Sequence, residues 1–374
     1  MKKYNLLILI MLLVLSACDD FLSEPPSKST SIQVSTTEHL DFLLNSYNEF
    51  YQEGNTDVIF GSDDFGLLVS LYDNNPAVYD VTVAQYATWD VENLAVLEDR
   101  PYYPAEWEKI YKANLVLDNL GDVTGPEEDK MALKAEAHFI RAYSYYQMVN
   151  TYCLPYATEN MDELGLTLKK STSFEESSAR VSLQETWDFI VSDLEEALKL
   201  DRELEFIDGK YRTWRASTPA INAFAARVYL TMGDYTKALT YAQSALDDHN
   251  ELVDYNTEMS YTDQIIEVKD GDGNPYRLMY PYTYEGQGAT DIRMAWKEMY
   301  YFRFLNNGYW NYFPSEELLA IYDQTNDLRY VYHMVEGYSY DRGCTISHPA
   351  YIFFFDKIPS GPTTAEMLLV KAEC

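Results

Sequence analysis

The chain has 374 residues, in which 60 Asp and Glu outnumber 28 Lys and Arg, so its formal net charge is −32. This charge excludes a simple nucleic-acid-binding protein and adsorption to anionic lipid, because both need clustered cations. Hydrophobic residues make up 47% and aromatic residues 15% of the chain, which excludes a disordered protein. The 34 tyrosines are unusual, and so many amphipathic rings indicate a surface that contacts a ligand or partner.

The N-terminus predicts export and lipid attachment. Two lysines precede ten unbroken apolar residues, Leu6–Leu15, a run too short to span a membrane and typical of a secretory signal. Ser16-Ala17-Cys18 follows directly and resembles a bacterial lipobox, in which the cysteine becomes the diacylated N-terminus. The alternative is an ordinary signal with an incidental cysteine. We predict a lipoprotein signal peptide over residues 1–17, lipidation at Cys18, and a lipidated tether over residues 18–36.

The first element after the tether is a helix near residues 37–52. Ser35 and Glu38 form a capping-box pattern, and leucines and tyrosines recur at helical spacing behind it. Residues 53–88 have no helical period and contain several glycines. We predict an irregular segment there with short strands.

Paired helices then follow one another along the chain. Apolar periodicity and end signals predict them over residues 105–120, 126–150, 182–198, 218–232 and 235–248, and Ser182 with Glu185 forms a second capping box. In the last pair, Ala226, Ala238 and Ala245 are small where two helices must approach closely, and this spacing resembles a tetratricopeptide repeat. The alternative is an ordinary helical hairpin. We predict a mainly α fold with tetratricopeptide-like repeats over about 105–250.

The spacing of the apolar residues is no longer helical after residue 263. Two apolar runs around an Asp- and Gly-rich turn predict a β-hairpin over 265–280. The turn begins like a calcium-binding EF-hand loop, but its sixth and twelfth positions are Pro275 and Pro281. We therefore interpret it as a turn. Helix signals return over 314–322 and 365–374.

Six segments, in order and at matching spacing, resemble the SusD/RagB family of Bacteroidetes outer-membrane lipoproteins. They are Cys18–Leu22, Asp63-Asp64, Trp107–Asn114, Ala135–Tyr143, Ala225–Leu230 with Gly233–Tyr235, and Ala365–Glu373. The resemblance implies one SusD-like domain over residues 37–374, with ligand-facing irregular segments at about 53–104 and 255–345. Family members usually continue past the last motif, so we expect this chain to be C-terminally truncated.

The family resemblance also implies a function. We expect a cell-surface protein, lipid-anchored in the outer membrane, that binds an oligosaccharide and delivers it to a SusC-like TonB-dependent transporter. Two alternatives stay open: a peptide-binding member of the same family, and a helical-repeat scaffold for protein interactions. A glycosidase is not favoured, because 60 acidic residues make any carboxylate pair unspecific.

Two groups of residues could bind a sugar, because each combines aromatic faces with polar groups suited to hydroxyls. Trp89 and Trp296 could equally be core residues, and we assign Trp107 and Trp187 to the core. If the second segment is helical, Arg293, Trp296 and Tyr300 share one face. The ligand-binding candidates are Asp64, Trp89 and Asn93 in the first group, and Arg293, Trp296, Tyr300 and Trp310 in the second.

The sequence predicts no catalytic residue, no metal site and no cofactor. Its five histidines lack the spacing of a metal-binding motif, and the chain has no phosphate-binding loop, dinucleotide fingerprint or nucleophile elbow. Three cysteines remain after Cys18, which makes a disulfide framework improbable, although a Cys153–Cys344 bridge stays open.

Overall fold

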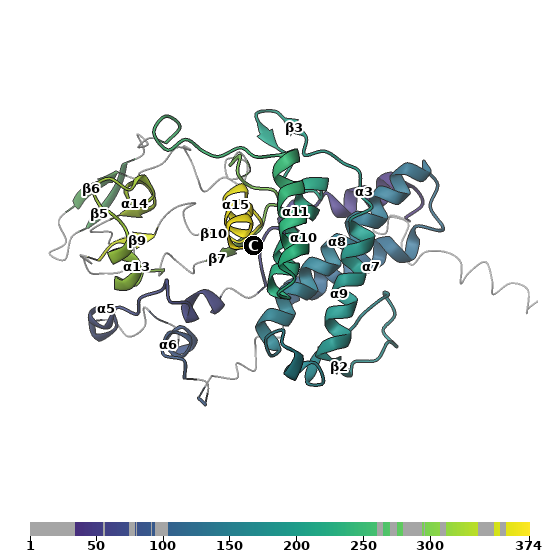
Figure 1. The fold of residues 1–374 in the computed structure, drawn as a ribbon, viewed down its shortest axis with the longest axis horizontal. Coiled ribbons are helices and arrows are strands. Elements are labelled where there is room, and N and C mark those ends of the chain that lie inside the picture. The colour runs from purple at the N-terminus through teal and green to yellow at the C-terminus, as the bar shows by residue number, and fades with distance from the viewer. Residues whose placement is uncertain are drawn as a thin grey trace, which may run out of the picture.

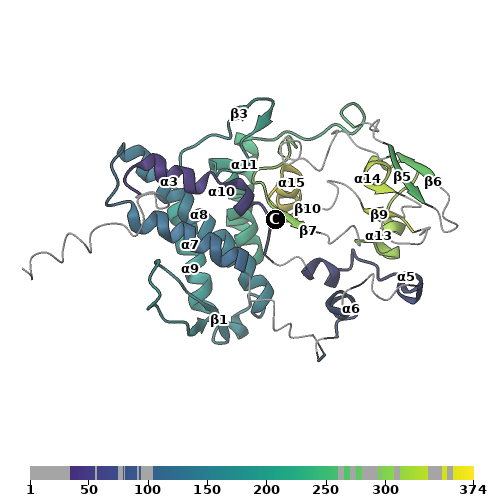
Figure 2. The same ribbon diagram turned by 180° about the vertical axis from the view of Figure 1, so that it is seen from behind.

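The protein is described by a computed structural model. It covers residues 34–54, 57–74, 79, 81–90, 92–93, 104–259, 265–269, 275–279, 294, 296–306, 312–335, 348–351 and 357–374. The architecture is mainly helical, and the described elements form two parts (Figures 1 and 2). None of the helices in these ranges is long and apolar enough to span a membrane.

The helical half consists of antiparallel neighbours that pack on one another. Its helices are α3 (Thr37–Leu44), α4 (Tyr47–Phe50), α7 (Pro104–Asn119), α8 (Glu127–Tyr152), α9 (Leu183–Ala197), α10 (Thr218–Thr231), α11 (Tyr235–Asp248) and the last helix α15 (Thr364–Glu373). A short 3-10 turn, η3 (Thr158–Asn160), follows α8. The tetratricopeptide-like helical fold is confirmed.

The packing of α10 against α11 follows from their sequences. Ser217 and Asp234 accept hydrogen bonds from backbone N–H groups of the first turn of each helix. Between the helices, Gly233 takes a φ of 74°, which a residue with a side chain rarely adopts, so the chain turns back at once. Ala226, Ala238 and Ala245 are fully buried between the helices, as their small size predicts. Trp187 lies in the same core, as expected.

Two details of the first helix differ from expectation. The predicted helix over 37–52 is broken after Leu44, and its N-cap is Thr36, without a side-chain cap bond. The predicted Ser35–Glu38 capping box is therefore wrong. The Ser35 carbonyl instead accepts a hydrogen bond from the Thr124 N–H at 2.9 Å, and this pairing keeps Thr36 extended just before the helix begins. The capping box at Ser182 and Glu185 is confirmed.

The second half, which we call the aromatic lobe, comprises the described residues of 57–93 and 312–351. Its helices are short: η1 (Asp57–Gly61), α5 (Val69–Asn74), α6 (Val81–Ala87), α13 (Glu316–Ile321) and α14 (Leu328–His333). The prediction of short strands over 53–88 is wrong for the described residues, which form single-residue bridges only. Helices of two turns or fewer leave too little periodicity to recognise in a sequence.

Strands occur only as antiparallel pairs within the described ranges. The pairs are β1 (Leu164–Thr167) with β2 (Arg180–Ser182), β3 (Phe206–Ile207) with β4 (Lys210–Tyr211), β5 (Ile265–Lys269) with β6 (Pro275–Met279), β7 (Phe304–Asn306) with β10 (Lys357–Pro359), and β8 (Met334–Val335) with β9 (Ala350–Tyr351). The β5–β6 hairpin confirms the predicted one.

The two halves are joined where four chain segments meet. The Glu53 N–H donates to the Phe304 carbonyl at 2.9 Å, and the Phe304 N–H donates to the Tyr51 carbonyl at 2.8 Å. The buried Glu53 carboxylate accepts hydrogen bonds from the hydroxyls of Tyr143 and Ser360 at 3.1 and 3.0 Å. Helix α8 and the segment before α15 are thus tied to the strand that leads to the aromatic lobe.

Candidate functional site

The two segments expected to face a ligand meet in the aromatic lobe. The Ser315 N–H donates to the Asp64 carbonyl at 2.8 Å, and the Ser315 hydroxyl donates to the Asp63 carbonyl at 2.6 Å. Phe65 and Pro314 form an antiparallel bridge beside them. The same Ser315 hydroxyl caps α13. One serine therefore fixes the Asp63-Asp64 turn against a segment about 250 residues away in the chain.

Half-buried tyrosines gather beside this turn. Tyr312 and Tyr351 lie with ring centroids 6.1 Å apart, and Tyr322 packs with Tyr351 on a small core around Leu319. Tyr255 approaches from the chain that follows α11, and its hydroxyl lies 3.0 Å from Nε2 of His333. We call Tyr255, Tyr312, Tyr322, Tyr332 and Tyr351 the tyrosine cluster.

Burial keeps the phenols of Tyr255, Tyr312, Tyr322 and Tyr351 protonated. Burial, with the neighbouring carboxylates of Asp64 and Asp63, raises the pKa of Tyr312 to about 12. Burial also raises the pKa of Tyr255 and Tyr351 and lowers the pKa of His333 to about 3, so this imidazole is neutral. Neutral phenols can donate as well as accept hydrogen bonds. The cluster therefore offers both functions next to the Asp64 carboxylate.

Trp89 is presented to solvent by an uncommon turn. Helix α6 ends in a Schellman pattern, with the Asp90 N–H donating to the Gln85 carbonyl at 2.9 Å and the Trp89 N–H donating to the Tyr86 carbonyl at 3.1 Å. The position that usually needs glycine is occupied by Trp89, with a φ of 54°. Its side chain is 73% exposed. A bulky residue held in this conformation without burial suggests a functional constraint.

Asn93 belongs to the same turn. Its side-chain amide donates to Oδ1 of Asp90 at 2.9 Å, which folds the loop back on the end of α6. Helix α6 itself is packed on the lobe through Val83 and Tyr86. Asp64, Trp89 and Asn93 thus all lie on the aromatic lobe.

The described members of the second group of ligand-binding candidates are buried in the core. Trp296 and Tyr300 are 4% and 0% exposed, and residues 296–301 are not helical, so the shared helix face does not exist there. Trp296 lies edge-on to Tyr255 at 6.4 Å, and the Tyr300 hydroxyl donates to the His249 carbonyl at 2.5 Å. Trp296 therefore packs against Tyr255 from within the core, whereas Tyr300 belongs to the core of the helical half. Arg293, Trp310 and Cys18 lie outside the described residues.

The sequence did not reveal the tyrosine cluster. Its members come from three separated stretches of the described chain and show neither a helical nor a strand period, so the only available signal was the count of 34 tyrosines. In the described part of the chain, no group of three His, Cys, Asp or Glu side chains is arranged to hold a metal ion. Cys153 is a free cysteine.

Comparisons with known proteins identify relatives of this chain. A SusD-like family model, described as starch-binding and associating with the outer membrane, matches residues 20–230. SusD-like protein P2 of Formosa agariphila is 25% identical over 257 residues, which cover 66% of this chain and 47% of that protein. SusD-like protein P38 of the same organism is 23% identical over 312 residues, and these residues make up 57% of that protein. The chain thus spans about half the length of the curated relatives it matches.

Solved structures show the same fold. A SusD superfamily protein from Bacteroides thetaiotaomicron aligns with a TM-score of 0.61 and 16% identity, over 90% of this chain and 75% of that one. A structure described as a laminarin-binding SusD-like protein aligns with a TM-score of 0.57 and 16% identity, over 90% of this chain and 79% of that one.

Proposed function

The chain belongs to the SusD-like family of starch-binding proteins that associate with the outer membrane, and from this membership we propose that it binds a neutral oligosaccharide on its aromatic lobe. The observation that carries the proposal is Trp89, which is 73% exposed in a backbone conformation that favours glycine. An indole face of this kind suits the apolar C–H face of a pyranose ring.

The polar groups of the aromatic lobe and of the tyrosine cluster fit the hydroxyls of a sugar. The phenols of the tyrosine cluster donate and accept hydrogen bonds, and the Asp64 carboxylate accepts them. The C–H face of a sugar ring packs on an aromatic surface, and the sugar hydroxyls need hydrogen-bond partners. The ring and the hydroxyl of a tyrosine supply both.

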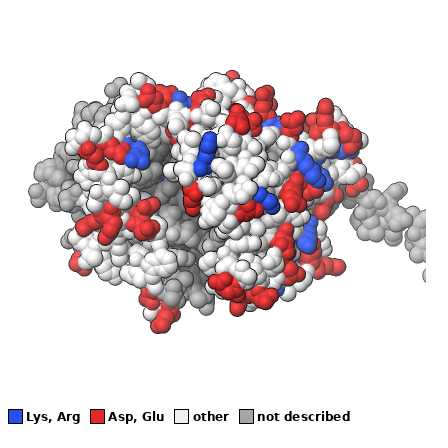
Figure 3. Space-filling model, viewed as in Figure 1, with Lys and Arg blue, Asp and Glu red and all other residues white. Residues whose placement is uncertain are grey.

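The charge of the protein argues for a neutral ligand. On the face seen in Figure 3, Asp and Glu cover more of the surface than Lys and Arg, which are scattered among them. With a net charge of −32, the protein repels anionic polymers at long range. Neutral glycans experience no such repulsion.

We further propose that the chain is anchored through a lipid on Cys18 and delivers its ligand to a SusC-like TonB-dependent transporter. Ser16-Ala17-Cys18 supports the anchor, and the family membership supports the partner. In this role the protein captures and passes on its ligand without chemical change. Metabolic labelling with a fatty acid would detect the anchor, and Cys18→Ala should abolish the label.

Affinity electrophoresis of the protein against a panel of neutral polysaccharides, with laminarin included, tests the proposed function. We expect retardation by at least one polysaccharide and no release of reducing ends. Binding of a peptide with no retardation across the panel would favour a peptide-binding family member. Release of products, abolished by a carboxylate substitution, would identify a glycosidase instead.

A further inference from the structure

The junction between the two halves encloses a buried carboxyl group that is not balanced by a direct ion pair. Glu53 follows α4, and its side chain is 3% exposed. Its Oε1 accepts the hydrogen bonds from the hydroxyls of Tyr143 and Ser360. Its Oε2 is buried without a hydrogen-bond partner, and Glu53 forms no ion pair with the described residues. Burial of an isolated carboxylate is costly, and such a group usually becomes neutral by taking up a proton.

A second carboxyl group lies beside Glu53. Glu106 on α7 is fully buried, and its Oε1 accepts hydrogen bonds from the Gly54 N–H at 3.0 Å and from Lys109 Nζ at 2.6 Å. Lys109 Nζ also donates to the Gln52 carbonyl at 2.6 Å. Glu106 and its lysine therefore hold the backbone on both sides of Glu53. Oε2 of Glu106 is also buried without a partner among the described residues, so each of the two acids leaves one oxygen unsatisfied.

The arginine of this interior is engaged by aromatic groups. Arg303 Nη2 donates to the Tyr301 hydroxyl at 2.6 Å, and its guanidinium lies over the rings of Tyr301 and Tyr143, 4.2 and 5.3 Å from their centroids. Its Nε is buried without a partner in the described part of the chain. Arg303 therefore stays near Glu53 without forming an ion pair with it, and Lys109 is already paired with Glu106.

The balance of these charges favours a proton on Glu53. Burial, and then the charge of Glu106, raise the pKa of Glu53 above 4.5 by more than the two neighbouring cations and the Ser360 hydroxyl lower it. Arg227, which acts on Tyr143 through its charge, is itself held by Glu366 at 2.6 Å. The charged and titratable groups that act on Glu53, or on its hydrogen-bond partner on α8, are Glu106 and Lys109 on α7, Tyr143 on α8, Arg227 on α10, and Tyr301 and Arg303 before β7.

We propose that Glu53 and Glu106 hold one proton between their two carboxyl groups, and that release of this proton loosens the junction between the two halves. The protonated Oε2 of one acid donates to the unpartnered Oε2 of the other, which satisfies both oxygens. On release, the proton passes to solvent and the pair changes from one negative charge to two. The hydrogen bond from the Glu53 N–H to the Phe304 carbonyl joins the halves at this place, so repulsion here acts on the junction itself.

The sign of the pH dependence follows from the raised pKa of Glu53. A folded-state pKa above the unfolded value stabilises the closed junction fully below pH 4.5, and this contribution is lost as the pH rises through the folded-state pKa. Between these two values, opening becomes up to about tenfold more favourable with each pH unit. Acid therefore closes the junction and alkali opens it.

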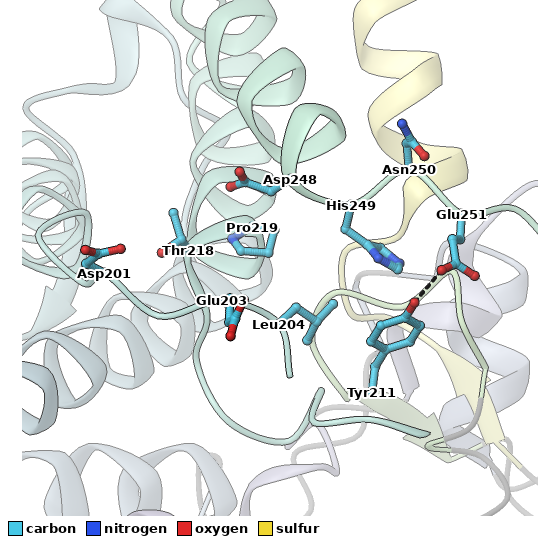
Figure 4. Close-up of a pocket in the computed structure, with 10 residues that line it drawn as sticks. All are labelled: Asp201, Glu203, Leu204, Tyr211, Thr218, Pro219, Asp248, His249, Asn250 and Glu251. Carbon is cyan, nitrogen blue, oxygen red and sulfur yellow. Dashed lines mark hydrogen bonds between the residues drawn. The ribbon is translucent and has the colours of Figure 1, made fainter. Parts of the chain in front are cut away.

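Figure 4 shows a pair of the same chemical groups at the surface. The Tyr211 hydroxyl donates to the Glu251 carboxylate, beside a pocket at the C-terminal end of α11. Glu251 thus has a phenol as its partner, as Glu53 has, but its side chain is exposed and water can hydrate it. Glu251→Gln is therefore the matched control, because it removes a phenol-bound carboxyl group that is not buried.

Infrared difference spectroscopy tests for the proton directly. At pH 7, the carbonyl band of a protonated carboxyl group should be present in wild type, lose one component in Glu53→Gln, and stay unchanged in Glu251→Gln. The comparison between variants is needed because burial also raises the pKa of Glu298, which can contribute to the same band in all three proteins. A band unchanged in a folded Glu53→Gln protein would overturn the proposal. Circular dichroism verifies that each variant folds.

Amide hydrogen exchange tests the effect on the junction. The amides of residues 53 and 304 report on it, because they form the hydrogen bonds between Glu53, Phe304 and Tyr51. After correction for the intrinsic pH dependence of exchange, their protection should fall at least tenfold between pH 6 and pH 9 in wild type and in Glu251→Gln, and stay constant in Glu53→Gln. Constant protection in wild type would overturn the proposal, even if Glu53→Gln does not fold. Neither measurement uses a glycan, so its outcome is independent of the proposed glycan site.

Discussion

Arg215 and Glu136 form a bidentate ion pair in the interior of the helical half. Arg215 Nε lies 2.6 Å from Oε1 of Glu136 and Nη2 lies 2.6 Å from Oε2, and both side chains are 1% exposed. Arg202 Nη1 approaches the same carboxylate at 2.7 Å, and Arg215 Nη2 also contacts Asp41 at 2.8 Å. One carboxylate on α8 therefore connects α3, α8 and the segments around β3–β4.

Replacing Glu136 with Gln should destabilise the protein strongly. The change removes the buried charge that compensates Arg215 and leaves its guanidinium with only the half-exposed carboxylate of Asp41; breaking a buried ion pair typically costs about 3–5 kcal/mol. Chemical denaturation should show this loss in the free energy of unfolding. Glu128→Gln is the control, because Glu128 is exposed on the same helix, and it should change stability by less than about 0.5 kcal/mol. Equal stability of the two variants would contradict the account.

The same pair predicts a specific response to acid. Burial by itself would raise the pKa of Glu136, but the charges and hydrogen bonds of Arg215 and Arg202 outweigh it and lower the pKa from 4.5 to about 2. A lowered folded-state pKa stabilises the protein above pH 4.5, and this contribution is lost as the pH falls towards 2. It amounts to about 3 kcal/mol, at 1.36 kcal/mol per unit.

Chemical denaturation of wild type and Glu136→Gln between pH 6 and pH 2 measures this contribution. The difference in unfolding free energy between the two proteins should shrink as the pH falls through this window. A difference that stays constant with pH would show that Glu136 is not held ionised by its arginines.

The helical half could be predicted from the sequence because its signals are local. The Ser182–Glu185 capping box, Gly233 and the small residues Ala226 and Ala238 each act within one helix or one turn. The capping-box prediction at Ser35 and Glu38 failed because a distant residue intervened: Thr124 pairs with the chain before α3 and holds Thr36 extended. Local patterns therefore predict elements well except where partners far along the chain compete for the same backbone groups.

The candidate site was predictable only in part, and for the same reason. Asp64, Trp89 and Asn93 lie on the aromatic lobe, as a ligand-facing role requires. Trp296 and Tyr300 have the composition of a binding surface but are buried, because Tyr255 and the chain after α11 cover them. Which aromatic residues face outward depends on tertiary contacts that no sequence spacing encodes.

Gly361 should not tolerate any side chain. A Cβ added there would lie 1.8 Å from the Tyr301 carbonyl oxygen and 3.2 Å from the Arg303 backbone N. These are backbone atoms of the junction between the two halves, where the Gly361 N–H also donates to the Arg303 carbonyl at 3.2 Å. Gly361→Ala should lower the unfolding free energy by about 3 kcal/mol, in the range of severe core substitutions.

Thermal unfolding compares this change with Gly121→Ala. A Cβ at Gly121 meets no atom within 4 Å, so that variant should unfold close to the wild-type temperature. A Gly361→Ala protein as stable as wild type would mean that the junction is not closely packed.

Trp296 and Trp89 should respond to substitution in opposite ways. Trp296 is 4% exposed, so Trp296→Ala should cost about 3–5 kcal/mol of stability, as for other buried large-to-small changes. Trp89 is 73% exposed with a φ of 54°, so Trp89→Gly relieves backbone strain and should raise stability by up to about 1 kcal/mol. Denaturation midpoints measure both, and a large loss with Trp89→Gly would make this indole a packing residue.

The affinity of the full chain for its best-retained neutral glycan, measured by calorimetry for wild type, Trp89→Ala and Trp89→Phe, tests the proposed function most directly. Phe174→Ala is the matched control, because Phe174 is 96% exposed but lies on the helical half. We predict at least tenfold weaker binding for Trp89→Ala, partial recovery with Trp89→Phe, and wild-type affinity for the control. Wild-type affinity of the Trp89→Ala protein would contradict the assignment of the glycan site to this surface.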